Sequence, residues 1–234
     1  MGILLFNNNI NMIKKFKIYS ERCSGTNYLE NLIFKNFDIE LTSKFGHKHF
    51  FGFNDLKNHK NTLFVCIVRD IYTWINSLYR TPHHLRQNNC ISINNFLSKE
   101  IISYEFNCKN FNGEPNQGKE ILKDRNIYTN KRYKNIFELR HLKLKYLIED
   151  LPTRVDNYII IRYEDLLENF IETMNKIKEC GLKVKKNIKF PLNETNYKKQ
   201  NKKYKINNDN KISKELIYKN KNFNSYYEKK LDYY

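Results

Sequence analysis

Hydrophobic and polar positions along the chain form two kinds of segment. Short unbroken apolar runs at Phe16–Tyr19, Thr62–Val68 and Tyr158–Ile161 predict strands of a buried parallel sheet, and Ile39–Phe45 is a further candidate strand. Other stretches carry apolar residues three or four positions apart, which predicts amphipathic helices. These stretches are Tyr28–Phe37, Ile71–Tyr79, Asn135–Glu149 and Leu166–Cys180. The alternation predicts an α/β fold, a three-layer α/β/α arrangement around a central, mostly parallel sheet.

The chain of 234 residues has the length of one α/β domain, so we interpret 1–234 as a single domain. Its α/β core is expected to span 16–181, because Gly181 follows the last predicted helix as a typical C-terminal cap. A polar insert occupies 85–130, and 182–234 form a basic, tyrosine-rich C-terminal region.

The composition narrows the choice of partner and compartment. The net charge of +17 attracts polyanions such as nucleic acid or a multiply charged nucleotide, although much of the lysine excess is typical of coding bias in an AT-rich genome. Five cysteines without a CxxC pair predict neither a zinc site nor a disulfide framework. The apolar stretch Ile3–Phe6 is too short for a signal peptide or a membrane span. We therefore expect a soluble, cytoplasmic protein with no membrane partner.

A small glycine-containing loop, Ser20–Asn27, lies between the first strand and the first helix, and it carries most of the motif Glu21–Leu29. Backbone N–H groups around Gly25 can point at a phosphate, and the helix N-terminus adds partial positive charge. Ser24 and Thr26 supply hydroxyl groups. The alternative is a plain helix N-cap made by one of these two side chains. The lysine and first glycine of the GxxxxGK[ST] loop are absent, which speaks against an ATPase or kinase.

Two further motifs follow later strands. Arg69 ends the strand Thr62–Val68, and Ser77 comes eight positions later on the next helix, so both can reach one anion. Tyr163–Leu166, with the sequence Tyr-Glu-Asp-Leu, follows the strand Tyr158–Ile161. Taken alone, Arg69 and Ser77 are better interpreted as a solvated arginine and an ordinary helix serine, and Tyr163–Leu166 is also consistent with a strand-to-helix junction capped by acids. Because ligands of open α/β sheets bind at the carboxyl ends of the strands, we expect all three motifs to converge there.

In this order the three motifs resemble the sulfotransferase family, which uses 3′-phosphoadenosine-5′-phosphosulfate (PAPS). That family has a Ser-Gly-Thr loop after its first strand, an Arg and a Ser eight positions apart, and a Tyr-Glu-Asp-Leu junction. The loop is similar to that of a branch with Glu-Arg-x-Ser-Gly-Thr-Asn-Tyr-Leu, and Tyr79–His84 is similar to its Tyr-Arg-x-Pro-His-His segment. The resemblance covers most of 16–170.

The resemblance implies a metal-free site for PAPS. Arg69 and Ser77 would hold the 3′-phosphate, and Tyr163 would lie near the adenine. A P-loop-like loop would hold the 5′-phosphosulfate, and its residues are Arg22, Cys23, Ser24, Gly25, Thr26 and Asn27.

The sequence departs from the family at two places. Cys23 stands where many members carry a basic residue, and we expect Arg22 or Lys48 to supply the charge. The later Arg-Lys-Gly element, another contact to the 3′-phosphate, is absent. Replacements for it are only guesses, which fall on Arg125, Arg132 and Lys198–Lys199.

Sulfuryl transfer needs a base for the acceptor proton and cations for the leaving phosphate. His49 is the first candidate for the base, His47 is the second, and Lys48 with Arg22 would offset charge. The acceptor stays open among a carbohydrate, a protein tyrosine and a small molecule. There are two alternatives. A basic nucleic-acid-binding protein without catalysis would leave the ordered motifs unexplained, and a P-loop nucleotide kinase would need the loop lysine that this sequence lacks. The sequence does not indicate an oligomeric state.

Overall fold

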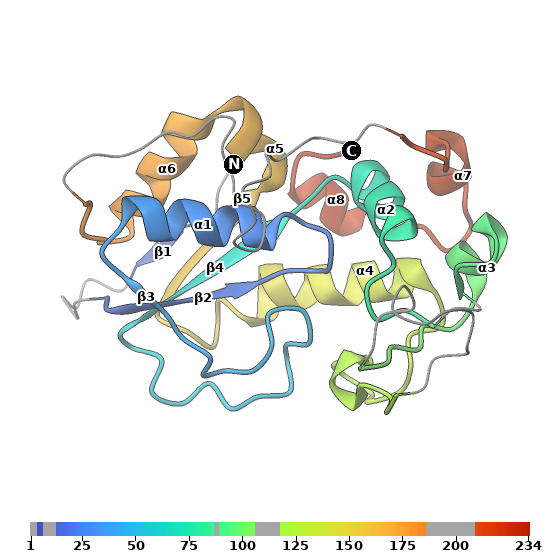
Figure 1. Cartoon of the computed structure of the whole chain (residues 1–234), viewed down its shortest axis with the longest axis horizontal. Helices are drawn as coiled ribbons and strands as arrows, with labels where there is room; N and C mark the ends of the chain where they lie inside the picture. The colour runs from blue at the N-terminus through green and yellow to red at the C-terminus, as the bar shows by residue number, and fades with distance from the viewer. Residues whose placement is uncertain (1–3, 7–12, 87–88, 106–117, 186–208) are drawn as a thin grey trace.

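The computed structural model describes residues 4–6, 13–86, 89–105, 118–185 and 209–234. Its centre is a sheet with the strand order β1-β5-β4-β2-β3, in which β1 is antiparallel to β5 and the other strands are parallel to one another (Figure 1). The strands are β1 Leu4–Phe6, β2 Lys15–Tyr19, β3 Glu40–Leu41, β4 Thr62–Val68 and β5 Asn157–Arg162. The α/β fold expected from the sequence is confirmed.

Helices cover both faces of the sheet (Figure 1). On one face, α1 and α6 pack against apolar residues such as Ile18 and Val65. On the other face, α4 packs against residues such as Phe64 and Ile160. The helical segments are α1 Thr26–Asn36, α2 Ile71–Arg80, α3 Ile93–Ser98, η3 Leu122–Asp124, α4 Ile136–Lys145, η4 Tyr146–Asp150, α5 Tyr163–Glu168, α6 Phe170–Glu179, α7 Lys214–Tyr218 and α8 Tyr226–Lys230.

The sheet order reverses direction at β2. From β2 the chain passes through α1 to β3 on one side, and then crosses to β4 on the other side of β2. The loop after β2 and the end of β4 therefore meet at a topological switch point. Open α/β sheets bind their ligands at such points.

Two expected elements differ from the structure, and one strand was not expected. The strand expected at Ile39–Phe45 is wrong beyond Glu40–Leu41, because polar residues follow and Phe45 adopts a left-handed backbone with φ 72°. The single helix expected at Leu166–Cys180 is two helices, α5 and α6, which are separated where Asn169 leaves helical geometry at φ −123° and ψ 45°. The strand β1 was not predicted.

The C-terminal region contributes to the core, although its sequence is strongly polar. Ile212 and Ile217 are buried beside α2 and α4, while Tyr227 and Leu231 are buried beside η4. The helix α8 thus lies near the end of the sheet that carries the motifs (Figure 1). Among the described residues, none of the helices combines the length and apolar character that crossing a membrane requires.

Candidate functional site

The loop after β2 is built without a capping side chain. Helix α1 begins at Thr26, and its N-cap is Gly25 with φ 91° and ψ 15°, which makes no side-chain cap hydrogen bond. A plain N-cap made by Ser24 or Thr26 is therefore not what the loop forms. The hydroxyl of Ser24 is fully buried and has no hydrogen-bond partner among the described residues. Uncapped helix amides and an unpaired buried hydroxyl together suit a bound anion.

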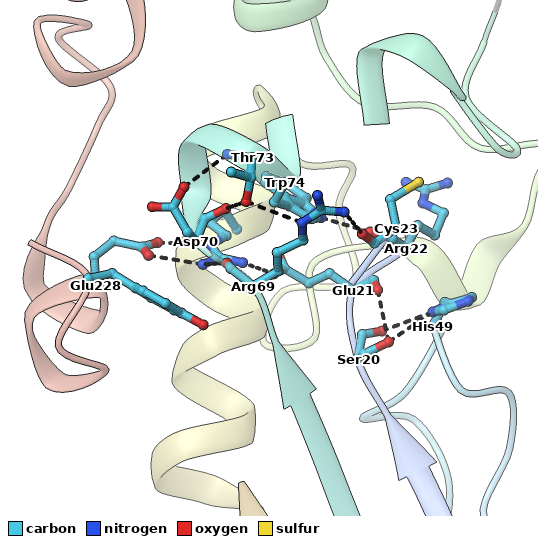
Figure 2. Close-up of polar contacts among 12 residues, drawn as sticks. Ser20, Glu21, Arg22, Cys23, His49, Arg69, Asp70, Thr73, Trp74 and Glu228 are labelled. Carbon is cyan, nitrogen blue, oxygen red and sulfur yellow. Dashed lines mark hydrogen bonds and ion pairs between the residues drawn. The ribbon is translucent and has the colours of Figure 1, made fainter. Parts of the chain in front are cut away.

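The carbonyl groups of the loop are already bound within the protein. Trp74 donates from Nε1 to the carbonyl of Arg22 at 2.7 Å, and Arg69 donates from Nη1 to the carbonyl of Cys23 at 3.1 Å (Figure 2). With these acceptors occupied, the loop can offer a ligand mainly donors. This arrangement also favours an anion.

Arg69 and Tyr163 meet the loop at Gly25. Arg69 is 9% exposed, and its guanidinium lies 4.7 Å from the centroid of the Tyr163 ring. The same ring packs so closely on Gly25 that a Cβ there would lie 2.8 Å from Cε2. Ser77 lies beside the loop as well, because its side chain is close enough to the Cys23 thiol to oppose the rise that burial causes in the pKa of that thiol, while the thiol itself donates to the Thr81 carbonyl at 3.6 Å. The structure thus brings Arg69, Ser77 and Tyr163 to the loop, with Tyr163 as a buried support for it.

Arg22 points away from the loop. Its Nη1 donates to the carbonyl of His83 at 2.9 Å and to the Ser103 hydroxyl at 3.0 Å, and its Nη2 lies 3.1 Å from Asp124 Oδ2. The side chain is buried among these partners. Its charge therefore holds the insert against the core. Arg22 is not positioned to contact a phosphosulfate in the loop, as the sequence had suggested.

Lys48 supplies a cation beside the N-terminus of α1. Its Nζ donates to Asn27 Oδ1 at 2.6 Å and lies 3.5 Å from Glu30 Oε2. Burial, with help from Lys48, lowers the pKa of the neighbouring Lys17 to about 8. A repulsion between two ammonium groups at this place would be relieved by a bound anion.

The hydrogen bonds of the two candidate bases define their tautomers. Nδ1 of His49 faces the carbonyl of Ser20 at 3.1 Å, so this nitrogen carries the proton and Nε2 holds the lone pair (Figure 2). Nδ1 of His47 instead accepts the backbone N–H of His49 at 3.2 Å, which leaves the proton on its Nε2. His49 is therefore the imidazole that presents a free acceptor nitrogen.

Burial keeps the two imidazoles and the Cys23 thiol neutral. Burial lowers the pKa of His49 well below its ordinary value, against the opposing effect of the Ser20 hydrogen bond. Burial, with help from Lys48, lowers the pKa of His47 to about 4. Burial raises the pKa of the Cys23 thiol to about 11. At neutral pH the site thus contains neutral imidazoles and a protonated thiol, which suits proton acceptance by His49 and gives Cys23 no thiolate chemistry.

Two buried ionic groups support the site, and sequence reasoning missed most of their members. In the first, Arg140 bridges Glu21 and Glu228, and burial raises the pKa of Glu21 to about 7. In the second, Asp124 pairs with Arg22 and with Lys143, whose Nζ also donates to the His49 carbonyl at 2.9 Å. No local motif marks Arg140, Lys143, Asp124 or Glu228, since they lie in an amphipathic helix, a polar insert and a lysine-rich tail.

The guesses for the missing Arg-Lys-Gly element gain no support. Arg125 and Arg132 both bind the carboxylate of Glu120, at 3.0 and 2.7 Å, on the insert. Lys198–Lys199 lie outside the described residues. Within the part of the chain that the structure describes, no three His, Cys, Asp or Glu side chains lie close enough to hold a metal ion.

Comparisons of the chain with protein-family models, with curated proteins and with solved structures found no match.

Proposed function

We propose that this chain is a sulfotransferase that moves a sulfuryl group from PAPS to a hydroxyl or amine acceptor. The observation that carries the proposal is the loop after β2, where an uncapped helix N-terminus and the buried, unpaired Ser24 hydroxyl meet two cations, Lys48 and Arg69. A doubly anionic adenosine needs positive charge at two separated places, and this site offers Arg69 at the Cys23 carbonyl and Lys48 at Asn27, before and after Gly25 along the loop.

The proposed reaction is an in-line displacement at sulfur. The acceptor oxygen or nitrogen forms a bond to sulfur while the bond from sulfur to the 5′-phosphate oxygen breaks, and 3′,5′-bisphosphoadenosine leaves. His49 Nε2 takes the acceptor proton, which its neutral state and its tautomer permit. Lys48 and the amides around Gly25 offset the charge on the leaving phosphate. The chemistry leaves the acceptor open among a carbohydrate, a protein tyrosine and a small molecule.

A binding experiment tests the proposal directly. 3′,5′-Bisphosphoadenosine should raise the melting temperature of the protein more than ATP with magnesium does at equal concentration, because only the former carries a 3′-phosphate. The reverse order would favour a nucleotide kinase.

The free thiols of Cys23, Cys66, Cys90 and Cys180 fit a reducing compartment, so we propose that the protein acts in the cytoplasm.

Arg69 should discriminate the 3′-phosphate. Arg69→Met removes one charged hydrogen-bond donor, so affinity for 3′,5′-bisphosphoadenosine should fall about 10- to 100-fold, measured by titration calorimetry. Affinity for 5′-AMP, which lacks that phosphate, should change little. Equal losses for the two nucleotides would mean that Arg69 acts only by holding the Cys23 carbonyl, and would remove the 3′-phosphate role.

Ser24 should affect binding without affecting stability. Because its buried hydroxyl has no partner, Ser24→Ala should not lower the melting temperature. It should reduce the affinity for 3′,5′-bisphosphoadenosine about tenfold. Thr173→Val is the matched control, since that hydroxyl donates to the carbonyls of Asp165 and Asn169. It should lower the melting temperature and leave the affinity unchanged. A Ser24→Ala protein that binds the nucleotide normally would argue against an anion in the loop.

A further inference from the structure

Glu228 joins the C-terminal region to the candidate site through one guanidinium. Arg140 donates to Glu228 from Nε at 2.8 Å and from Nη2 at 2.9 Å, a two-point contact between fully buried side chains. The same guanidinium binds Glu21, the first residue of the loop motif. It also donates from Nη2 to the Arg69 carbonyl at 2.7 Å. One side chain therefore contacts the ends of β2 and β4 and the helix α8.

Trp74 extends this contact to the loop backbone. The guanidinium of Arg140 lies 5.1 Å from the centre of the Trp74 ring. Nε1 of Trp74 in turn donates to the carbonyl of Arg22 (Figure 2). Arg140 thus contacts residues 21–22 in two ways, directly at Glu21 and through Trp74 at the Arg22 carbonyl. A displaced Arg140 would shift the loop on one side and Arg69 on the other.

The C-terminal segment reaches the end of β5 as well. Tyr233 donates its hydroxyl to Glu164 Oε2 at 2.7 Å, while Oε1 of the same carboxylate accepts the backbone N–H of Asp70 at 3.1 Å. Arg162 Nη1 donates to the carbonyl of Leu231 at 3.2 Å. The end of β5 is therefore bound directly to residues 228–233, and the ends of β2 and β4 are linked to them through Arg140 and Glu164.

We propose that Arg140 and Glu228 are a positioning pair for the nucleotide site, through which α8 sets how tightly the loop and Arg69 hold their ligand. The pair touches no ligand and acts through Glu21, Trp74 and the Arg69 backbone. This inference rests on the proposed function for the identity of the ligand. The contacts of Arg140 and Glu228 that support it are independent of that function. A region that its sequence marks only as a basic tail is thereby part of the site.

Glu228→Gln is the test, because it keeps the size of the side chain and removes the charge that holds Arg140. Affinity for 3′,5′-bisphosphoadenosine should fall at least about tenfold, since small misplacements of binding groups are costly. Trp74, the one tryptophan of the chain, should shift its fluorescence emission as Arg140 moves. Circular dichroism reports whether the variant is folded, and the milder Glu228→Asp replaces it if it is not.

Tyr227→Phe is the matched control on the same helix. It removes a hydroxyl that donates to Glu149 Oε2 at 2.8 Å, a contact to η4 and not to the strand ends. It should lower the melting temperature and leave both the Trp74 emission and the affinity unchanged. Equal emission and equal affinity in the two variants would overturn the positioning role. If wild-type protein does not bind 3′,5′-bisphosphoadenosine, the proposed function fails. The positioning role of Arg140 and Glu228 is then tested only by whether Glu228→Gln shifts the Trp74 emission and Tyr227→Phe does not.

Discussion

Replacing His49 by asparagine should lower the rate of sulfuryl transfer by about 100- to 10,000-fold, the contribution typical of a general base. Asparagine keeps a donor where Nδ1–H contacts the Ser20 carbonyl, and it removes Nε2. The fold and the affinity for 3′,5′-bisphosphoadenosine should therefore persist while turnover is lost. The measurement is the single-turnover rate with PAPS and an acceptor found by screening.

The pH dependence of the same rate gives a second readout. A base works in its neutral form, and burial lowers the pKa of His49 well below its ordinary value. The wild-type rate should therefore stay constant as the pH falls from 8 to the ordinary histidine pKa of about 6.5, and decline only in more acidic solution. This acidic decline should be absent from the residual activity of His49→Asn.

His47→Gln is the control, because His47 lies in the same loop and carries the opposite tautomer. Its Nε2 bears a proton and cannot accept one, so the substitution should leave turnover nearly unchanged. A large loss in His47→Gln together with normal turnover in His49→Asn would transfer the role of the base to His47.

The sequence predicted the parts of the fold that depend on local pattern. The strand β4 matches its apolar run from Thr62 to Val68, because a central parallel strand is buried on both faces. The motif residues Cys23 and Arg69 also lie together, because the carboxyl ends of adjacent parallel strands share one edge. Such features follow from periodicity and chain order alone.

Long-range ion pairs could not be predicted in this way. Arg22 was expected at a phosphate, yet Asp124, about a hundred positions away, binds it inside the protein. Glu228 sits among lysines and tyrosines, and only the folded chain shows that it is buried against Arg140. Charged residues are exposed by default, so a sequence marks none of them as a buried partner. The supporting part of a site is for this reason harder to predict than the loop it supports.

Gly25→Ala should destabilise the protein by about 2–5 kcal/mol and abolish nucleotide binding. Two costs add up: a left-handed backbone at φ 91°, worth about 1–2 kcal/mol for alanine, and overpacking, worth about 1–3 kcal/mol. The overpacking arises because the new Cβ would lie 2.8 Å from Cε2 of Tyr163, and closer still to Cδ2. The ring is buried beside Arg69, so moving it would disturb that packing.

Gly181→Ala separates these two costs. Gly181 has a similar backbone, with φ 84°, but a Cβ there would meet nothing within 4 Å. The free energy of unfolding of Gly181→Ala, measured in urea, should fall only by the backbone cost of about 1–2 kcal/mol. This variant should bind 3′,5′-bisphosphoadenosine normally. The difference between the two variants then measures the contact between Gly25 and Tyr163. If both variants lose the same free energy of unfolding, Tyr163 yields without cost, and the close packing on Gly25 does not hold the loop in place.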